Sequence, residues 1–138
     1  MSYRHLEHST DAIIEVTAPD LTSAFQVAGK SVVETIIDSS KIEEKTMKRL
    51  SVTGKDLRYL LYNWLEEIII LTITDGFAAK RISIKIESNN GYKIEAEFCG
   101  EEIDIKKHGF KVEIKSPTFH EMYIQEGEQV TLRYLLDL

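Results

Sequence analysis

Residues 53–72 read "TGKDLRYLLYNWLEEIIILT", and their apolar side chains recur every three or four positions. The recurring residues are Leu57, Leu60, Leu61, Trp64, Leu65 and Ile68. This spacing is typical of an amphipathic helix that buries one face. Thr53 and Asp56 resemble a capping box at the start of the helix. At about 1.5 Å per residue the helix would be roughly 27 Å long, and we expect it to form the centre of the hydrophobic core.

A second amphipathic helix is predicted within "PDLTSAFQVAGKSVVETIID", residues 19–38. Its apolar stripe consists of Leu21, Ala24, Phe25, Ala28, Val32 and Ile36. Pro19 and Asp20 form a start signal, because the Asp20 carboxylate can accept hydrogen bonds from free backbone N–H groups of the first turn. The "AGKS" run at 28–31 lacks the preceding glycine of a phosphate-binding loop and falls inside this helix, so we do not interpret it as a nucleotide site.

The rest of the chain alternates apolar and polar residues with a period of two, which is typical of β-strands. The alternating runs are found at residues 13–18, 82–86, 92–98, 110–114 and 130–136. The turn signal Asn89-Asn90-Gly91 predicts a hairpin between the second and third of these strands. Together the elements predict an α+β fold: a single domain over residues 1–138, with a mainly antiparallel sheet and two amphipathic helices packed on one face of it.

The composition argues against several classes of protein. The chain has 138 residues, the size of one ordinary domain, and a net charge of −6, which argues against sequence-independent binding of nucleic acid. One cysteine, Cys99, has no partner for an internal disulfide. The start of the chain does not resemble a signal peptide, and the longest apolar run is too short and too charged to cross a bilayer. We therefore expect a cytoplasmic protein that does not contact membranes.

The four histidines do not form a recognisable metal-binding motif. His5 and His8 are three positions apart in a predicted strand and so point to opposite faces, while His108 and His120 have no cysteines at zinc-finger spacing. We interpret all four as surface or edge residues. Nucleophilic catalysis is equally unsupported, because the sequence has no Gly-x-Ser-x-Gly elbow and Cys99 has no base beside it.

Two aspartates near the ends of the chain are the remaining candidates. Asp11 precedes the apolar run 13–16, and Asp137 is followed by Leu138. Spacing along the chain cannot show whether they meet, so each is also consistent with a solvated residue at the end of a strand. If they meet, ligation by oxygen alone favours a hard divalent cation, Ca²⁺, Mg²⁺ or Mn²⁺, and the terminal carboxylate or carbonyl of Leu138 could add a ligand.

Four segments of the sequence, taken in order, have the form of one known family. They are "YRHLEHSTDAIIEVTAPDL" (3–21), "SVTGKDLRYLLYNWLEEIIIL" (51–71), "GEEIDIKKHGFKVEIKSPTFHEM" (100–122) and "LLDL" (135–138). They are similar to the corresponding segments of the archease family, and the resemblance covers essentially the whole chain. It implies a non-enzymatic activator of an RtcB-type RNA ligase, which promotes the guanylylation and multiple turnover of that ligase in tRNA splicing and RNA repair.

The resemblance also implies which residues act. The metal-binding residues of the family fall on Asp11 and Asp137, with Leu138 contributing a main-chain oxygen to a divalent ion. The lysine and histidine of its third segment fall on Lys115 and His120, which we expect to contact phosphate or the ligase. RNA would be contacted only indirectly, through that partner.

The sequence departs from the family pattern at three positions. Thr10 replaces the usual alanine before Asp11, Pro117 enters the block between the lysine and the histidine, and Phe119 replaces a tyrosine. Proline removes a backbone donor, so we expect Pro117 at a sheet edge or a bulge. The alternative function is that of a general chaperone or protein-interaction module. A metal-dependent hydrolase is disfavoured, because the sequence offers no cluster of base and nucleophile.

Overall fold

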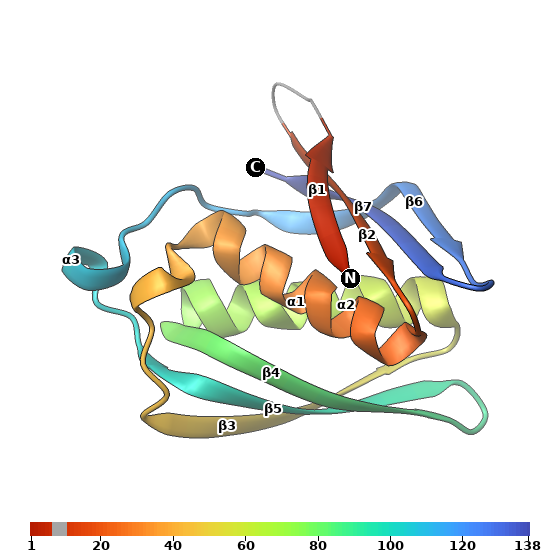
Figure 1. Cartoon of the computed structure of the whole chain (residues 1–138), viewed down its shortest axis with the longest axis horizontal. Helices are drawn as coiled ribbons and strands as arrows, with labels where there is room; N and C mark the ends of the chain where they lie inside the picture. The colour runs from red at the N-terminus through yellow and green to blue at the C-terminus, as the bar shows by residue number, and fades with distance from the viewer. Residues whose placement is uncertain (7–10) are drawn as a thin grey trace.

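Two long helices lie between two antiparallel β-sheets (Figure 1). The computed structural model describes residues 1–6 and 11–138, so His8 and Thr10 lie outside the described residues. The helices are α1 (Leu21–Ile36) and α2 (Leu57–Ile69). Each helix contacts strands of both sheets. The core therefore has an apolar layer on either side of the helix pair.

The terminal sheet carries the first and last strands of the chain and has the order β1-β2-β7-β6. Its strands are β1 (Ser2–Leu6), β2 (Asp11–Ala18), β6 (Ser116–Gln125) and β7 (Val130–Asp137). The hairpin sheet has the order β3-β5-β4 and consists of β3 (Thr46–Gly54), β4 (Phe77–Ser88) and β5 (Tyr92–Glu102). The shorter elements are a 3-10 turn, η1 (Ser39–Lys41), a π-helical turn, η2 (Ile70–Thr74), and the one-turn helix α3 (Ile105–His108).

The predicted fold class is confirmed, since the chain forms an α+β domain with antiparallel pairing and two amphipathic helices. The predicted hairpin is present: Ile82 pairs with Phe98 and Ile84 with Ala96, and Asn90 has a φ of 52° in the turn between the strands. The prediction that both helices cover one face of a single sheet is wrong. Strand β3, which the sequence analysis did not identify, pairs with β5 and completes a second sheet below the helices.

Aspartate residues cap both long helices. Asp20 accepts a hydrogen bond from the Ser23 backbone nitrogen at 2.7 Å at the start of α1, as predicted. Asp56 caps α2 in the same way. The predicted capping box is wrong, because Thr53 lies in β3 and the helix begins after Asp56. Within the described residues, no helix has the length and apolarity needed to cross a membrane.

Two buried polar contacts fix the helices in the core. The Trp64 indole nitrogen in α2 donates to the Phe25 carbonyl in α1 at 2.8 Å, and both side chains are fully buried. Ser31 donates to the Ala28 carbonyl at 2.6 Å and lies 2.5 Å from the Tyr134 hydroxyl, which therefore donates to Ser31. Burial raises the pKa of Tyr134. The serine of the "AGKS" run thus joins α1 to the terminal sheet.

Residues 109–115 cross from the hairpin sheet to the terminal sheet without forming a strand, so the predicted strand at 110–114 is wrong. Phe110 is 48% exposed whereas Ile114 is 2% exposed, which reproduces part of the alternation. The backbone hydrogen bonds go elsewhere, however. Lys111 donates to the Ile36 carbonyl at the end of α1, and Lys115 donates to the Asp137 carbonyl, each at 2.7 Å.

Replacing Gly54 by alanine should destabilise the fold, because Gly54 ends β3 where the strand meets the first turn of α2. A Cβ atom there would lie 2.4 Å from the Leu60 nitrogen and 2.6 Å from the Leu60 Cα. Backbone atoms cannot move aside as a side chain can, so we expect the free energy of unfolding to fall by roughly 1–3 kcal/mol in urea denaturation. Gly127→Ala is the matched control, since its Cβ would meet only the Gln129 carbonyl, at 3.8 Å. Equal unfolding midpoints for the two variants would contradict this packing.

Candidate metal site

The first and last residues of the central strand pair bring two carboxylates together. Asp11 opens β2, Asp137 closes β7, and the two residues are directly opposed in the antiparallel register. Opposed residues have Cβ atoms about 4.5–5.5 Å apart and share one face of the sheet. The two carboxylates are therefore within reach of a single cation. The sequence alone left this contact open.

The aspartate pair lies on the face of the terminal sheet that points away from the helices. Alternate residues of β2, such as Ile14 and Val16, are fully buried against the helices. Successive side chains of a strand point to opposite faces, so Asp11 and Glu15 lie on the outer face. The site is thus presented outward while the same strand supplies the core.

Glu15, on the same outer face, is occupied by protein cations. Arg133 donates to one carboxylate oxygen at 2.8 Å and Arg4 donates to the other at 3.0 Å. The hydrogen bonds from Arg133 and then Arg4 lower the pKa of the Glu15 carboxyl. The Glu15 carboxylate is therefore part of an ion-pair cluster and is a poor candidate for a ligand of a cation at Asp11 and Asp137.

The donors available at the site are oxygens. Across residues 1–6 and 11–138, no cluster of three or more His, Cys, Asp or Glu side chains forms a metal-binding group. Two carboxylates can still hold Mg²⁺ or Ca²⁺, because both ions accept main-chain oxygens and water as further ligands. Leu138 directly follows Asp137, and its partly buried side chain packs against the core, which fixes its main chain beside the pair. The residues present therefore fit a hard divalent cation.

Lys115 lies beside the aspartate pair. Its backbone nitrogen donates to the Asp137 carbonyl at 2.7 Å, and the next residue, Ser116, is the register partner of Asp137 in β6. The Lys115 side chain is exposed. Pro117 follows in β6, which is the edge of the terminal sheet, so its missing donor interrupts no pairing on the outer side.

His120 is placed farther from the pair than Lys115. It is four positions beyond Ser116 in β6, within the stretch between Thr118 and Tyr123 where the register with β7 shifts. Its side chain is exposed, and its backbone nitrogen donates to the Thr118 hydroxyl at 3.0 Å. The structure thus brings Asp11, Asp137 and Lys115 together and sets His120 apart along the strand.

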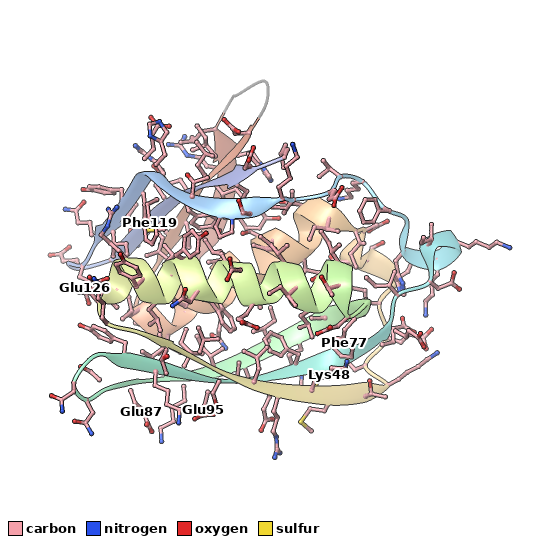
Figure 2. All side chains as sticks on the ribbon, turned by 180° about the vertical axis from the view of Figure 1, so that it is seen from behind. Lys48, Phe77, Glu87, Glu95, Phe119 and Glu126 are labelled. Atoms are coloured by element: carbon pink, nitrogen blue, oxygen red, sulfur yellow. The ribbon has the colours of Figure 1, made fainter. Side chains whose placement is uncertain are left out.

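Phe119, which departs from the family pattern, is a packing residue. Its ring stacks on Tyr62 with centroids 4.5 Å apart and also contacts Tyr59, at 5.0 Å, beside the first turns of α2 (Figure 2). A phenylalanine satisfies both ring contacts without a hydroxyl. This position therefore contributes to the attachment of β6 to α2 and does not face the aspartate pair.

Residues 3–138 match the Archease protein family (MTH1598/TM1083). The chain belongs to the archease family. The curated Protein archease of Pyrococcus abyssi is 34% identical over 125 residues, which cover 90% of this chain and 88% of the relative. The Protein archease of Pyrobaculum neutrophilum is 33% identical over 139 residues, which cover 99% of this chain and 95% of the relative. The solution structure of Methanobacterium thermoautotrophicum protein 1598 superimposes with a TM-score of 0.81 at 28% identity and covers 99% of both chains.

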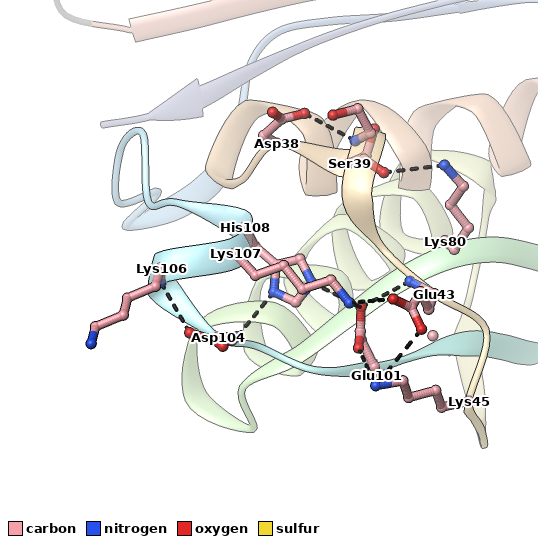
Figure 3. A network of polar contacts seen from close by, with 12 residues as sticks. Asp38, Ser39, Glu43, Lys45, Lys80, Glu101, Asp104, Lys106, Lys107 and His108 are labelled. Atoms are coloured by element: carbon pink, nitrogen blue, oxygen red, sulfur yellow. Dashed lines mark hydrogen bonds and ion pairs between the residues drawn. The ribbon is translucent and has the colours of Figure 1, made fainter.

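The chain also contains a partly buried ion cluster that was not predicted from the sequence, here called the Glu101 cluster and formed by Glu43, Lys45, Glu101, Lys107 and His108 (Figure 3). The Glu101 side chain is 8% exposed. It accepts hydrogen bonds from Lys107 at 2.8 Å, from the Glu43 backbone nitrogen at 2.8 Å and from His108 at 3.0 Å, and pairs with Lys45 at 3.4 Å.

His108 is buried, so its interpretation as a surface histidine is wrong. Its Nδ1 accepts a hydrogen bond from the Asp104 backbone nitrogen at 2.9 Å. The neutral imidazole then carries its proton on Nε2 and donates it to Glu101. A lysine, a histidine and a glutamate in "GEEIDIKKH" were visible in the sequence, but their convergence depends on the turn formed by α3.

The Glu101 cluster anchors the start of the segment that reaches the aspartate pair. It fixes α3, and the His108 carbonyl accepts a hydrogen bond from the Asp38 backbone nitrogen at 3.0 Å. Residues 109–115 then run past the end of α1 to Lys115, whose backbone is bonded to Asp137. The position of Lys115 is therefore set from both ends of this connection.

Replacing Glu101 by glutamine should destabilise the protein in a pH-dependent way. The Lys107 ammonium, together with the Glu43 backbone donor, holds the pKa of the Glu101 carboxyl far below its usual range. A depressed carboxyl pKa stabilises the fold above the unfolded value of about 4.3, and that stabilisation is lost as the pH falls below it. In urea denaturation at pH 7, the free energy of unfolding of the parent should be well above that of Glu101→Gln. The difference between the two free energies should shrink below about pH 4.5.

Glu97→Gln is the control on the same strand, because Glu97 forms an exposed ion pair with Arg49 and such pairs contribute little. If the free energies of unfolding of the parent and Glu101→Gln differ by the same amount from pH 7 to pH 3, the charge of Glu101 does not stabilise the fold.

Proposed function

We propose that this chain is a non-catalytic activator of an RtcB-type RNA ligase and promotes the guanylylation and multiple turnover of that ligase in tRNA splicing or RNA repair, in the cytoplasm. Membership of the archease family supports this role. The single observation that carries it is the direct opposition of Asp11 and Asp137 across β2 and β7, which gives the outer face of the terminal sheet an acidic pair.

The pair would hold one divalent cation, Ca²⁺, Mg²⁺ or Mn²⁺. Two carboxylates held close together repel each other, and a bound cation removes that repulsion. A main-chain oxygen of Leu138 and water would complete the ligand set. The cation would supply positive charge that orders oxygen ligands of the ligase at its guanylylation site.

Lys115 and His120 would contact the partner. The Lys115 backbone is bonded to Asp137, so its exposed ammonium would meet a phosphate or a carboxylate of the ligase near the cation site, and His120 would contact the partner farther along β6. The net charge of −6 favours docking to a basic, RNA-binding enzyme over docking to RNA, so RNA would be touched only through the ligase.

Binding of the cation should raise the melting temperature of the protein. A ligand that binds only the folded state stabilises it by about 2.7 kcal/mol at a hundred times its dissociation constant. Calcium, magnesium and manganese are added separately to metal-stripped protein in thermal denaturation. Asp11→Asn/Asp137→Asn should lose the metal-dependent shift, whereas Asp75→Asn, the same change at an exposed position after η2, should keep it. A shift of equal size in the double variant would place the cation elsewhere.

Stimulation of the ligase should depend on the same two residues. In multiple-turnover RNA ligation with the cognate ligase, GTP and metal, Asp11→Ala and Asp137→Ala should reduce the turnover number towards that of the ligase alone, and Asp75→Ala should not. If both site variants stimulate as well as the parent, the site assignment is wrong. Suppression of aggregation of many unrelated proteins, unaffected by a chelator and without stimulation of the ligase, would instead support the general chaperone function.

A further inference from the structure

A groove of about 660 Å³ lies over α1 between two strands that edge different sheets. Figure 1 shows α1 with β1 of the terminal sheet on one side and β4 of the hairpin sheet on the other. Tyr3, Val27 and Ile82 supply apolar surface, one from each element. The volume is within the range of about 300–1,000 Å³ that is typical of ligand-binding sites. The groove is separate from the aspartate pair, which lies on the outer face of the terminal sheet.

The groove has more positive than negative charge available to a ligand. Its cations are Lys30, Lys80 and Arg81, and its carboxylates are Glu34 and Glu44. Glu44 pairs with Arg81 at 2.9 Å. The two Glu34 oxygens accept hydrogen bonds from the hydroxyls of Tyr3, at 2.7 Å, and Ser39, at 2.8 Å. Burial and the bond to Glu34 raise the pKa of Tyr3, so it remains a donor.

Two lysines are left to attract an anion. Lys80 donates to the Ser39 carbonyl at 3.1 Å and not to a carboxylate. Lys30 is exposed, and among the described residues its ammonium has no hydrogen-bond or ion-pair partner. The three cations of the groove exceed its two carboxylates by one, and within the described part of the chain neither lysine has a carboxylate partner. This excess of positive charge beside apolar surface, in a chain of net charge −6, favours a ligand that is both acidic and partly apolar.

The backbone beside the groove favours an extended peptide as that ligand. β1 is an edge strand and pairs continuously with β2, so its other side is open to a further strand. Of the four edge strands, β4 and β6 each contain a register shift, which hinders such addition, whereas β1 and β3 do not. Of these two, β1 lines the groove. A phosphate would bind less well here. Lys30 lies in the middle of α1, where the backbone N–H groups bond within the helix and cannot donate to a phosphate. The Arg81 guanidinium is already paired with Glu44.

We propose that the groove binds an extended acidic segment of a protein partner, which adds to the free edge of β1. Its carboxylates lie at Lys30 and Lys80, and its alternate apolar side chains contact Val27 and Ile82. Binding needs neither Asp11 nor Asp137 and is independent of a cation.

The test uses a fluorescein-labelled peptide of alternating glutamate and valine, Glu-Val-Glu-Val-Glu-Val-Glu, and the isotope-labelled full chain. In NMR titration, shift changes should concentrate at Ser2, Tyr3, Lys30, Lys80 and Ile82. Fluorescence anisotropy should show binding that weakens with salt, because ion pairs at an open groove are screened. The matching lysine–valine peptide should not bind.

Lys30→Glu and Lys80→Glu should each weaken binding of the acidic peptide at least about tenfold, because a like charge then faces the peptide carboxylates. Lys106→Glu is the matched control: it makes the same change of charge on α3, where Figure 3 shows the Lys106 side chain pointing away from the Glu101 cluster. Amide spectra of all three variants check that the fold is kept.

Unchanged affinity in the Lys30→Glu and Lys80→Glu variants, or shift changes elsewhere on the molecule, would overturn the proposal. So would perturbation of the groove by guanosine monophosphate without binding of the acidic peptide, which would make this a phosphate site. Asp11→Ala should bind the peptide like the parent. Loss of ligase stimulation and loss of peptide binding are therefore separate results.

Discussion

The structure depends on the register between β2 and β7, which runs without interruption from the Asp11–Asp137 pair to the Ala18–Val130 pair. This register places Ile14 and Tyr134 opposite each other on the face that packs against the helices, where both are fully buried. The same alternation places the two aspartates on the outer face. A slip of one residue in either strand would turn its apolar residues outward, so burial of the core also holds the acidic pair in place.

A second constraint links the hairpin sheet to this site. The Glu101 carboxylate is 8% exposed, so removing Lys107, which donates to it at 2.8 Å, would leave its negative charge less compensated in a poorly hydrated place. The Glu101 cluster adds less to stability than its number of contacts suggests, but it defines one geometry for α3. Residues 109–115 then reach Lys115 with hydrogen bonds to the end of α1 and to Asp137. The surroundings of the aspartate pair are therefore fixed by contacts on both sides of the helix layer.

Much of the fold follows from sequence because periodicity reports burial. The two helices, β2, the β4–β5 hairpin and β7 were predicted in this way. β3 was missed because Val52 is its one buried residue, so it has almost no alternation to detect. Residues 110–114 alternate but bond to a helix end, which periodicity cannot distinguish from a strand. The pairing of Asp11 with Asp137 and the convergence at Glu101 join distant residues, and spacing along one chain does not encode such contacts.

The outer face of the terminal sheet also carries charge in a definite order. The acidic pair lies at one end, and Glu15 with its two arginines lies four residues along β2, about 13 Å away at roughly 3.3 Å per residue. Two guanidinium groups around one carboxylate leave a net positive charge there, and Arg4 is 69% exposed. On the proposed function, a partner docked across this face would place oxygen ligands at the cation held by the aspartate pair and acidic groups at the two arginines. Reversing such a partner would separate both sets of groups from their counterparts, so the order of charge would favour one direction of docking.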